Sequence, residues 1–127
     1  MKTLEQEFAG KIYQQVAEYE KKYPKEGDPA RKKYGSMAHK LPVLVRTAGL
    51  AQALAFVDSR GKDEHKELLK HLAKVTINAE VGEFLTQSRD ADLTEYLYLT
   101  RKTMLALKWY KRFAQSVLKI EPGEEDE

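Results

Sequence analysis

The sequence predicts an all-α fold, a compact bundle of about six helices in which the first and last helices are long. Apolar residues recur every three or four positions through most of the chain, and no stretch shows the sustained alternation that is typical of a strand. The length of 127 residues suits one core and is too short for two. We therefore expect a single helical domain over residues 1–120 and an acidic, disordered tail over residues 121–127.

The first helix is expected over about residues 3–23. Thr3 followed by Gln6 predicts a capping box at its start. The prolines and the glycine that follow predict a loop over residues 24–33. The buried face of this helix would consist of Leu4, Phe8, Ile12, Val16, Tyr19 and Tyr23.

The middle of the chain is expected to hold several shorter helices. A second helical region begins between residues 31 and 36, and Pro42 should divide it into two short helices, because proline lacks an amide hydrogen and its ring clashes with the preceding turn. Gly49 then joins or separates a helix over residues 50–58, which Gly61 helps to end.

A further helical repeat runs from His65 to Ala79, and Gly82 is expected to close or bend that helix. A short helical turn is expected over residues 83–88. The remaining helix, over about residues 92–119, is predicted to be the longest.

The last helix is predicted to have one basic side. Asp92 followed by Glu95 resembles a capping box at its start. At 100° per residue, four cations fall within about 20° of one line along it, and they are Arg101, Lys108, Arg112 and Lys119. The opposite side is expected to form the core face, from Leu99, Ala106, Leu107, Tyr110, Phe113, Ala114 and Val117. The cations either follow a phosphate backbone or pair with acids on neighbouring helices.

Three apolar residues, Leu97, Met104 and Leu105, lie on or beside the basic side of this helix. Either another helix covers them, or they form a contact surface for a partner protein or for another copy of the chain.

The net charge of +2 conceals an uneven distribution. Five of the twenty acidic residues stand in the last seven positions, so residues 1–120 carry a net charge of +7. Eight basic residues and two acidic ones lie between Lys21 and Arg46, and six basic residues and no acidic one lie between Arg101 and Lys119. Such clusters are the usual electrostatic footprint of a polyanion partner.

Two aromatic residues near the cations have alternative interpretations. Tyr34, in the cluster of Lys32, Lys33 and Lys40, either packs in the core or stacks on an exposed base. Trp109, at the boundary of the predicted core face, is expected to be a core aromatic rather than a platform for a base.

The sequence does not indicate an enzyme. The chain has no cysteine, which excludes disulfides, thiolate nucleophiles and thiolate metal sites. His39, His65 and His71 do not share a ligand spacing and are expected to be surface residues. Helix capping explains the acids around Asp92, and no glycine-rich phosphate loop or nucleophile elbow is present. We therefore expect no catalysis, no metal, no cofactor and no small-molecule substrate.

The chain is also expected to be cytoplasmic. Its longest uncharged stretch, residues 47–57, has 11 residues, whereas a helix needs about 20 apolar residues to cross a bilayer. Its first residues contain no apolar signal core.

Two segments resemble a known family. The first, residues 32–57, reads KKYGSMAHKLPVLVRTAGLAQALAFV, and the second, residues 99–118, reads LTRKTMLALKWYKRFAQSVL. They are similar to the signature region and the C-terminal helix of the small helical, fifth subunit of the type III-B CRISPR RNA-silencing (Cmr) complex. With the first helix, the resemblance covers most of residues 4–120.

The resemblance implies a non-catalytic subunit for antiviral defence that stacks in the minor filament of the complex. Its partners would be the other Cmr subunits, further copies of itself, the guide RNA and the target RNA. Its RNA-binding surface would fall on Lys33, Lys40, Arg46, Arg101, Lys108, Lys111 and Arg112. Two alternatives are an adaptor between proteins that does not contact RNA, and a DNA-binding regulator with a helix-turn-helix over residues 45–55.

Overall fold

The computed structural model describes residues 1–123 and confirms the all-α prediction. Its described part forms six helices and no strand. The helices are α1 (Leu4–Lys22), α2 (Pro29–Ala48), α3 (Leu50–Arg60), α4 (Asp63–Ile77), α5 (Val81–Asp90) and α6 (Leu93–Ser116). The last four residues of the predicted acidic tail lie outside the described residues, so its disorder stays a prediction, as does the division into domains.

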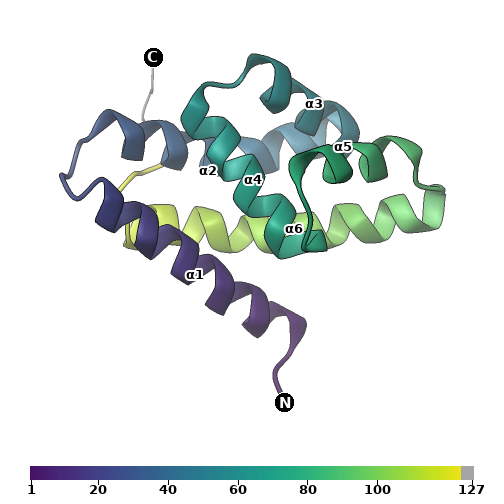
Figure 1. The fold of residues 1–127 in the computed structure, drawn as a ribbon, viewed down its shortest axis with the longest axis horizontal. Helices are drawn as coiled ribbons and strands as arrows, with labels where there is room; N and C mark the ends of the chain where they lie inside the picture. Colours follow the sequence, from purple (N-terminus) through teal and green to yellow (C-terminus); the bar gives the residue numbers. More distant parts are fainter. Residues whose placement is uncertain (124–127) are drawn as a thin grey trace.

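The longest helix, α6, packs against α1, α2, α4 and α5 (Figure 1). Helices α1 and α2 make the most extensive contacts with it, and α4 packs against α2 and α6. Helices α3 and α5 lie on the side of the molecule away from α1 (Figure 1). Side chains from all six helices form one buried cluster, to which Tyr34, Phe84 and Tyr110 contribute fully buried rings.

Local capping fixes the starts of three helices. The predicted capping box at α1 is present, with the Gln6 amide donating to Thr3 Oγ1 at 3.1 Å. Asp92 caps α6 by accepting from the amide of Glu95 at 2.9 Å. Asp28 caps α2 by accepting from the amide of Ala30 at 2.8 Å. Because Pro29 follows this cap, α2 begins inside the segment that was predicted to be a loop.

The predicted break at Pro42 is wrong. Helix α2 continues through Pro42 as a single helix of 20 residues. A proline inside a helix costs about 3 kcal/mol. Here Leu41 and Pro42 are both buried, and α2 packs against α3, α4 and α6. The burial of this long helix outweighs the local cost.

Other boundaries differ from the predicted ones. Gly49, with a φ of 89°, separates α2 from α3. Helix α4 ends at Asn78, which adopts the left-handed conformation, rather than at Gly82. Gly82 lies inside α5, which is a helix of ten residues and longer than the predicted turn. Helix α6 ends at Ser116, three residues before the predicted end.

Candidate nucleic-acid interface

The basic side of α6 is exposed along most of its length. Arg101, Lys108 and Arg112 are solvent-exposed and share one line along the helix. We call these three residues the α6 stripe. Lys108 Nζ lies 3.1 Å from Glu5 Oε2, and its side chain is still 66% exposed. Within residues 1–123, the side chains of Arg101 and Arg112 make no ion pair or hydrogen bond. Two of the three cations are therefore available to an anionic partner.

Lys111 and Lys119 differ in their position relative to the α6 stripe. Lys111 is exposed and lies about 60° around the helix from Lys108. Lys119 is also exposed, but it follows the end of α6 and has a φ of 63°. Lys119 therefore does not continue the stripe, contrary to the prediction.

The three apolar residues beside the stripe do not form one surface. Met104 and Leu105 are half-buried and pack against the core, so neighbouring helices cover part of them. Leu97 is 49% exposed. It lies near Leu93 and Tyr98, which are also exposed, so the first two turns of α6 present an apolar surface.

The cations of α2 are divided between two faces. Lys33 is half-buried and Lys40 is exposed, and both lie close to one line along the helix. Arg46 is exposed but lies about 120° around the helix from Lys40. The structure does not bring these three residues together into one patch.

Tyr34 cannot stack on a base. Its side chain is fully buried and stacks on Tyr19, with the ring centroids 4.3 Å apart. Burial raises the pKa of its hydroxyl well above the ordinary value. Trp109 is half-buried and packs against Phe113, with the ring centroids 5.5 Å apart. Its placement agrees with the predicted boundary of the core.

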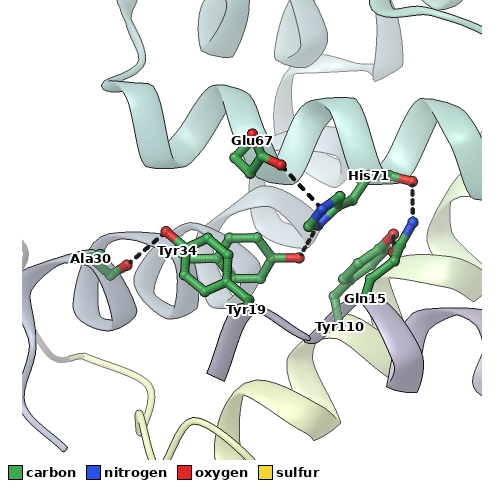
Figure 2. Close-up of polar contacts among 7 residues, drawn as sticks. All are labelled: Gln15, Tyr19, Ala30, Tyr34, Glu67, His71 and Tyr110. Atoms are coloured by element: carbon green, nitrogen blue, oxygen red, sulfur yellow. Dashed lines mark hydrogen bonds and ion pairs between the residues drawn. The ribbon is translucent and has the colours of Figure 1, made fainter. Parts of the chain in front are cut away.

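The prediction of three surface histidines is wrong. His39 and His65 are buried, and His71 is half-buried. The Tyr34 hydroxyl oxygen lies 2.7 Å from His71 Nδ1, within hydrogen-bond distance, and His71 Nε2 lies 3.3 Å from a carboxylate oxygen of Glu67 (Figure 2). Burial lowers the pKa of His71, and the Glu67 carboxylate opposes this effect.

The polar network around His71 joins four helices. Gln15 of α1 donates to the backbone carbonyl of His71 and accepts from the hydroxyl of Tyr110 on α6 (Figure 2). Because Tyr34 and Tyr110 are fully buried, their hydroxyls help to hold the four helices together.

Sequence reasoning missed a row of exposed cations on α4. Lys66, Lys70 and Lys74 are all exposed and follow one another at a spacing of four residues. This spacing places them on one face of the helix and could have been recognised in the sequence.

Residues 1–123 contain no group of three or more side chains that could hold a metal ion. None of the helices within this range is long and apolar enough to cross a bilayer.

Comparisons with known proteins agree with one another. Residues 4–117 match the family model described as CRISPR-associated protein (Cas_Cmr5). The CRISPR system Cmr subunit Cmr5 of Thermus thermophilus is 49% identical over 118 residues, which cover 93% of this chain and 98% of that protein. A crystal structure of a CRISPR-associated Cmr5 family protein from Thermus thermophilus superposes with a TM-score of 0.82 and 49% identity. That match covers 93% of this chain and 99% of the solved chain.

Proposed function

Because the chain belongs to the Cas_Cmr5 family of CRISPR-associated proteins, we propose that it is a non-catalytic subunit of a type III-B Cmr complex and contacts RNA. Its partners in antiviral defence are the other Cmr subunits, further copies of itself, and the guide and target RNA. The complex works in the cytoplasm.

The α6 stripe is the observation that carries the RNA contact. An ordinary solvated helix face mixes acids and bases, because like charges one turn apart repel each other by a few tenths of a kcal/mol. Between Arg101 and Lys119 the chain has six basic residues and no acid. Only Lys108 of the stripe meets an acid within residues 1–123. A phosphate backbone supplies the missing negative charge.

Contacts of this kind do not read sequence. Arginine and lysine side chains that meet phosphates position a protein on a nucleic acid without distinguishing its bases. In an RNA-guided complex, base pairing between guide and target supplies the choice of sequence. Lys111 and the α2 cations Lys33, Lys40 and Arg46 add to the same electrostatic attraction. A single copy therefore binds RNA weakly, and a filament of several copies binds it well.

The exposed start of α6 gives the protein a second kind of contact. Leu97, with Leu93 and Tyr98 beside it, forms an apolar surface that a monomer would leave in water. We assign this surface to a neighbouring Cmr subunit or to another copy of the chain. The half-buried Met104 and Leu105 follow it along α6.

Charge reversal of the α6 stripe tests the RNA contact. The variant Arg101→Glu/Lys108→Glu/Arg112→Glu should weaken capture of target RNA by the reconstituted complex by at least tenfold. Folding should be retained, because the exposed pair between Lys108 and Glu5 contributes about 0–1 kcal/mol. RNA capture is measured by filter binding, and folding by circular dichroism and Tm.

The matched control reverses three exposed lysines on α4, in the variant Lys66→Glu/Lys70→Glu/Lys74→Glu. It changes the net charge by the same amount and should bind RNA more tightly than the stripe variant. A folded stripe variant that captures RNA like the wild type would contradict the RNA contact. The chain would then be an adaptor between proteins. Crosslinks from RNA to Lys108 or Lys111 in the complex would contradict that adaptor.

A further inference from the structure

A groove of about 600 Å³ lies between α2, α3 and the segment that follows α6. Its walls include Val43 of α2 and Phe56 of α3. Two exposed cations also line it, Lys40 of α2 and Arg60 of α3, and none of the described lining residues is acidic. Within residues 1–123, the Arg60 side chain makes no ion pair or hydrogen bond. The groove therefore carries an excess of positive charge, and one of its cations, Lys40, belongs to the surface assigned to RNA above.

The segment after α6 brings an acidic stretch of the chain to this groove. Ile120 is 2% exposed, and its backbone carbonyl lies 2.9 Å from His39 Nε2. Pro122 and Gly123 line the groove and form a turn, in which Gly123 has a φ of 91°. The next four residues, 124–127, read EEDE. Because the packing of Ile120 fixes the segment before them, these four acidic residues begin at the groove.

The length of this acidic stretch limits what it can reach. Four residues span at most about 14 Å when fully extended, so their carboxylates reach only cations close to Gly123. Lys40 and Arg60 line the same groove as Gly123, whereas no residue of the α6 stripe lines it. A short tether holds a binding group at an effective concentration of about millimolar. The carboxylates of the chain itself therefore have an advantage at these two cations over an anion in solution.

We propose that residues 124–127, the end of the acidic tail, pair with Lys40 and Arg60 in the absence of RNA, and that RNA displaces them. Carboxylates and phosphates both accept hydrogen bonds from ammonium and guanidinium groups, so the two compete for the same donors. Exposed ion pairs are individually weak and are screened by salt, so the tail lowers the affinity for RNA without abolishing binding. This inference rests on the proposed function, because it regulates the RNA contact of Lys40.

Neutralisation of the tail in the full chain tests this competition. The variant Glu124→Gln/Glu125→Gln/Asp126→Asn/Glu127→Gln removes four negative charges. Fluorescence anisotropy measures its Kd for a single-stranded RNA of eight nucleotides at 50 mM salt. We expect the variant to bind this RNA about three- to tenfold more tightly than the wild type, because the tethered competitor is lost.

The matched control removes four exposed acids from other surfaces, in the variant Glu18→Gln/Glu26→Gln/Glu80→Gln/Glu83→Gln. None of these residues lines the groove, so this variant reports the effect of net charge alone. It should gain less RNA affinity than the tail variant. Equal gains for the two folded variants would overturn the proposal, as would an unchanged Kd for the tail variant.

A double-mutant cycle tests which cations the tail meets. In the background Lys40→Gln/Arg60→Gln, neutralising the tail should increase RNA affinity by no more than the matched control does, because the tail has lost its partners. In the background Lys66→Gln/Lys70→Gln, on the exposed row of α4, the full gain should persist. A full gain without Lys40 and Arg60 would show that the tail acts elsewhere and would overturn the proposal.

Carbodiimide crosslinking separates this inference from the proposed function. Without RNA, Lys40 should form amide bonds with carboxylates of residues 124–127 in the same chain, identified by mass spectrometry, and added RNA should reduce their yield. If these crosslinks are absent while charge reversal of the α6 stripe still weakens RNA capture, the inference is wrong and the proposed function stands. Crosslinks of the tail that occur only in covalent dimers would place it on a second copy and would also overturn the inference.

Discussion

His71 lies between the carboxylate of Glu67 and the buried hydroxyl of Tyr34, where a neutral ring is favoured (Figure 2). The Glu67 carboxylate faces Nε2 and only accepts, so in the neutral ring Nε2 carries the hydrogen and Nδ1 accepts from the Tyr34 hydroxyl. A second proton on Nδ1 would require the Tyr34 hydroxyl to turn and accept this hydrogen bond in place of donating it. Burial disfavours the charged ring as well, and the pKa of His71 is lowered as a result.

This arrangement predicts that acid destabilises the fold. The unfolded chain takes up a proton at His71 near pH 6.5, whereas the folded chain does so at a lower pH. The free energy of unfolding therefore falls as the pH drops below about 6.5, by at most about 1.4 kcal/mol per pH unit for one proton. Urea unfolding between pH 7.5 and 5 should show a smaller decrease for His71→Gln than for the wild type. Parallel curves for the two proteins would contradict this assignment.

Tyr34 shows that the hydrophobic pattern of a sequence does not always decide whether a side chain is buried. Tyr34 stands in a run of lysines, which suits either a stacked base or a packed ring. Its neighbours in space are Tyr19 of α1 and His71 of α4, and both are distant in the sequence. No local pattern indicates that a lysine-rich segment would turn its one tyrosine inward.

At the scale of elements, α2 and the segment after α6 approach each other at a glycine. An added Cβ at Gly35 would lie 2.7 Å from Cβ of Ile120. The segment is held there because the Ile120 amide donates to Ala114, and the carbonyl of Ile120 accepts from His39. Only glycine permits this close contact without moving the segment.

We therefore predict that two glycine substitutions change the free energy of unfolding in opposite directions. Alanine is favoured over glycine in a helix by about 1 kcal/mol, and Gly10 in α1 has open space around its Cβ position. Gly10→Ala should stabilise the protein by up to this amount. Gly35→Ala should destabilise it by about 1–3 kcal/mol, because overpacking exceeds the gain in propensity. Urea unfolding of both variants provides the measurement, and stabilisation by Gly35→Ala would show that the segment moves freely.

Helix α2 also shows how packing overrides a local signal. Pro42 predicted two short helices, and the structure has one, because a buried helix of 20 residues gains more from its neighbours than one proline costs. The start of the same helix could have been predicted from neighbouring residues, because Asp28 is an N-cap residue and Pro29 follows it in the first turn.

At the scale of the whole molecule, the positive charge is spread over several faces. The α6 stripe, the α4 lysines, and Lys40 and Arg46 of α2 are exposed on different helices. Under the proposed function, long-range attraction to RNA would depend on all of them, whereas phosphate contacts would depend on those that lie against the strand.

Salt dependence distinguishes contacts from general attraction. About five phosphate contacts to single-stranded RNA predict a slope of about −3.5 for the logarithm of the association constant against the logarithm of salt concentration. Neutralising the stripe, as Arg101→Gln/Lys108→Gln/Arg112→Gln, should make this slope shallower by about 2. The α4 variant Lys66→Gln/Lys70→Gln/Lys74→Gln should change it less. If the slope stays the same without the stripe, those three residues do not touch phosphates.

By itself, the sequence determined that the chain is helical, where several helices begin, which face of α6 is buried, and to which family the chain belongs. The helical properties depend on residues three or four positions apart, and the family on the order of residues in two segments, so both can be recognised along the chain. The tertiary structure alone decided that α2 runs through Pro42, that His39, His65 and Tyr34 are buried, and that Arg46 lies apart from Lys40. It also created the groove beside Phe56. These properties depend on contacts between helices distant in sequence, and the free energy of that packing exceeds the local preferences.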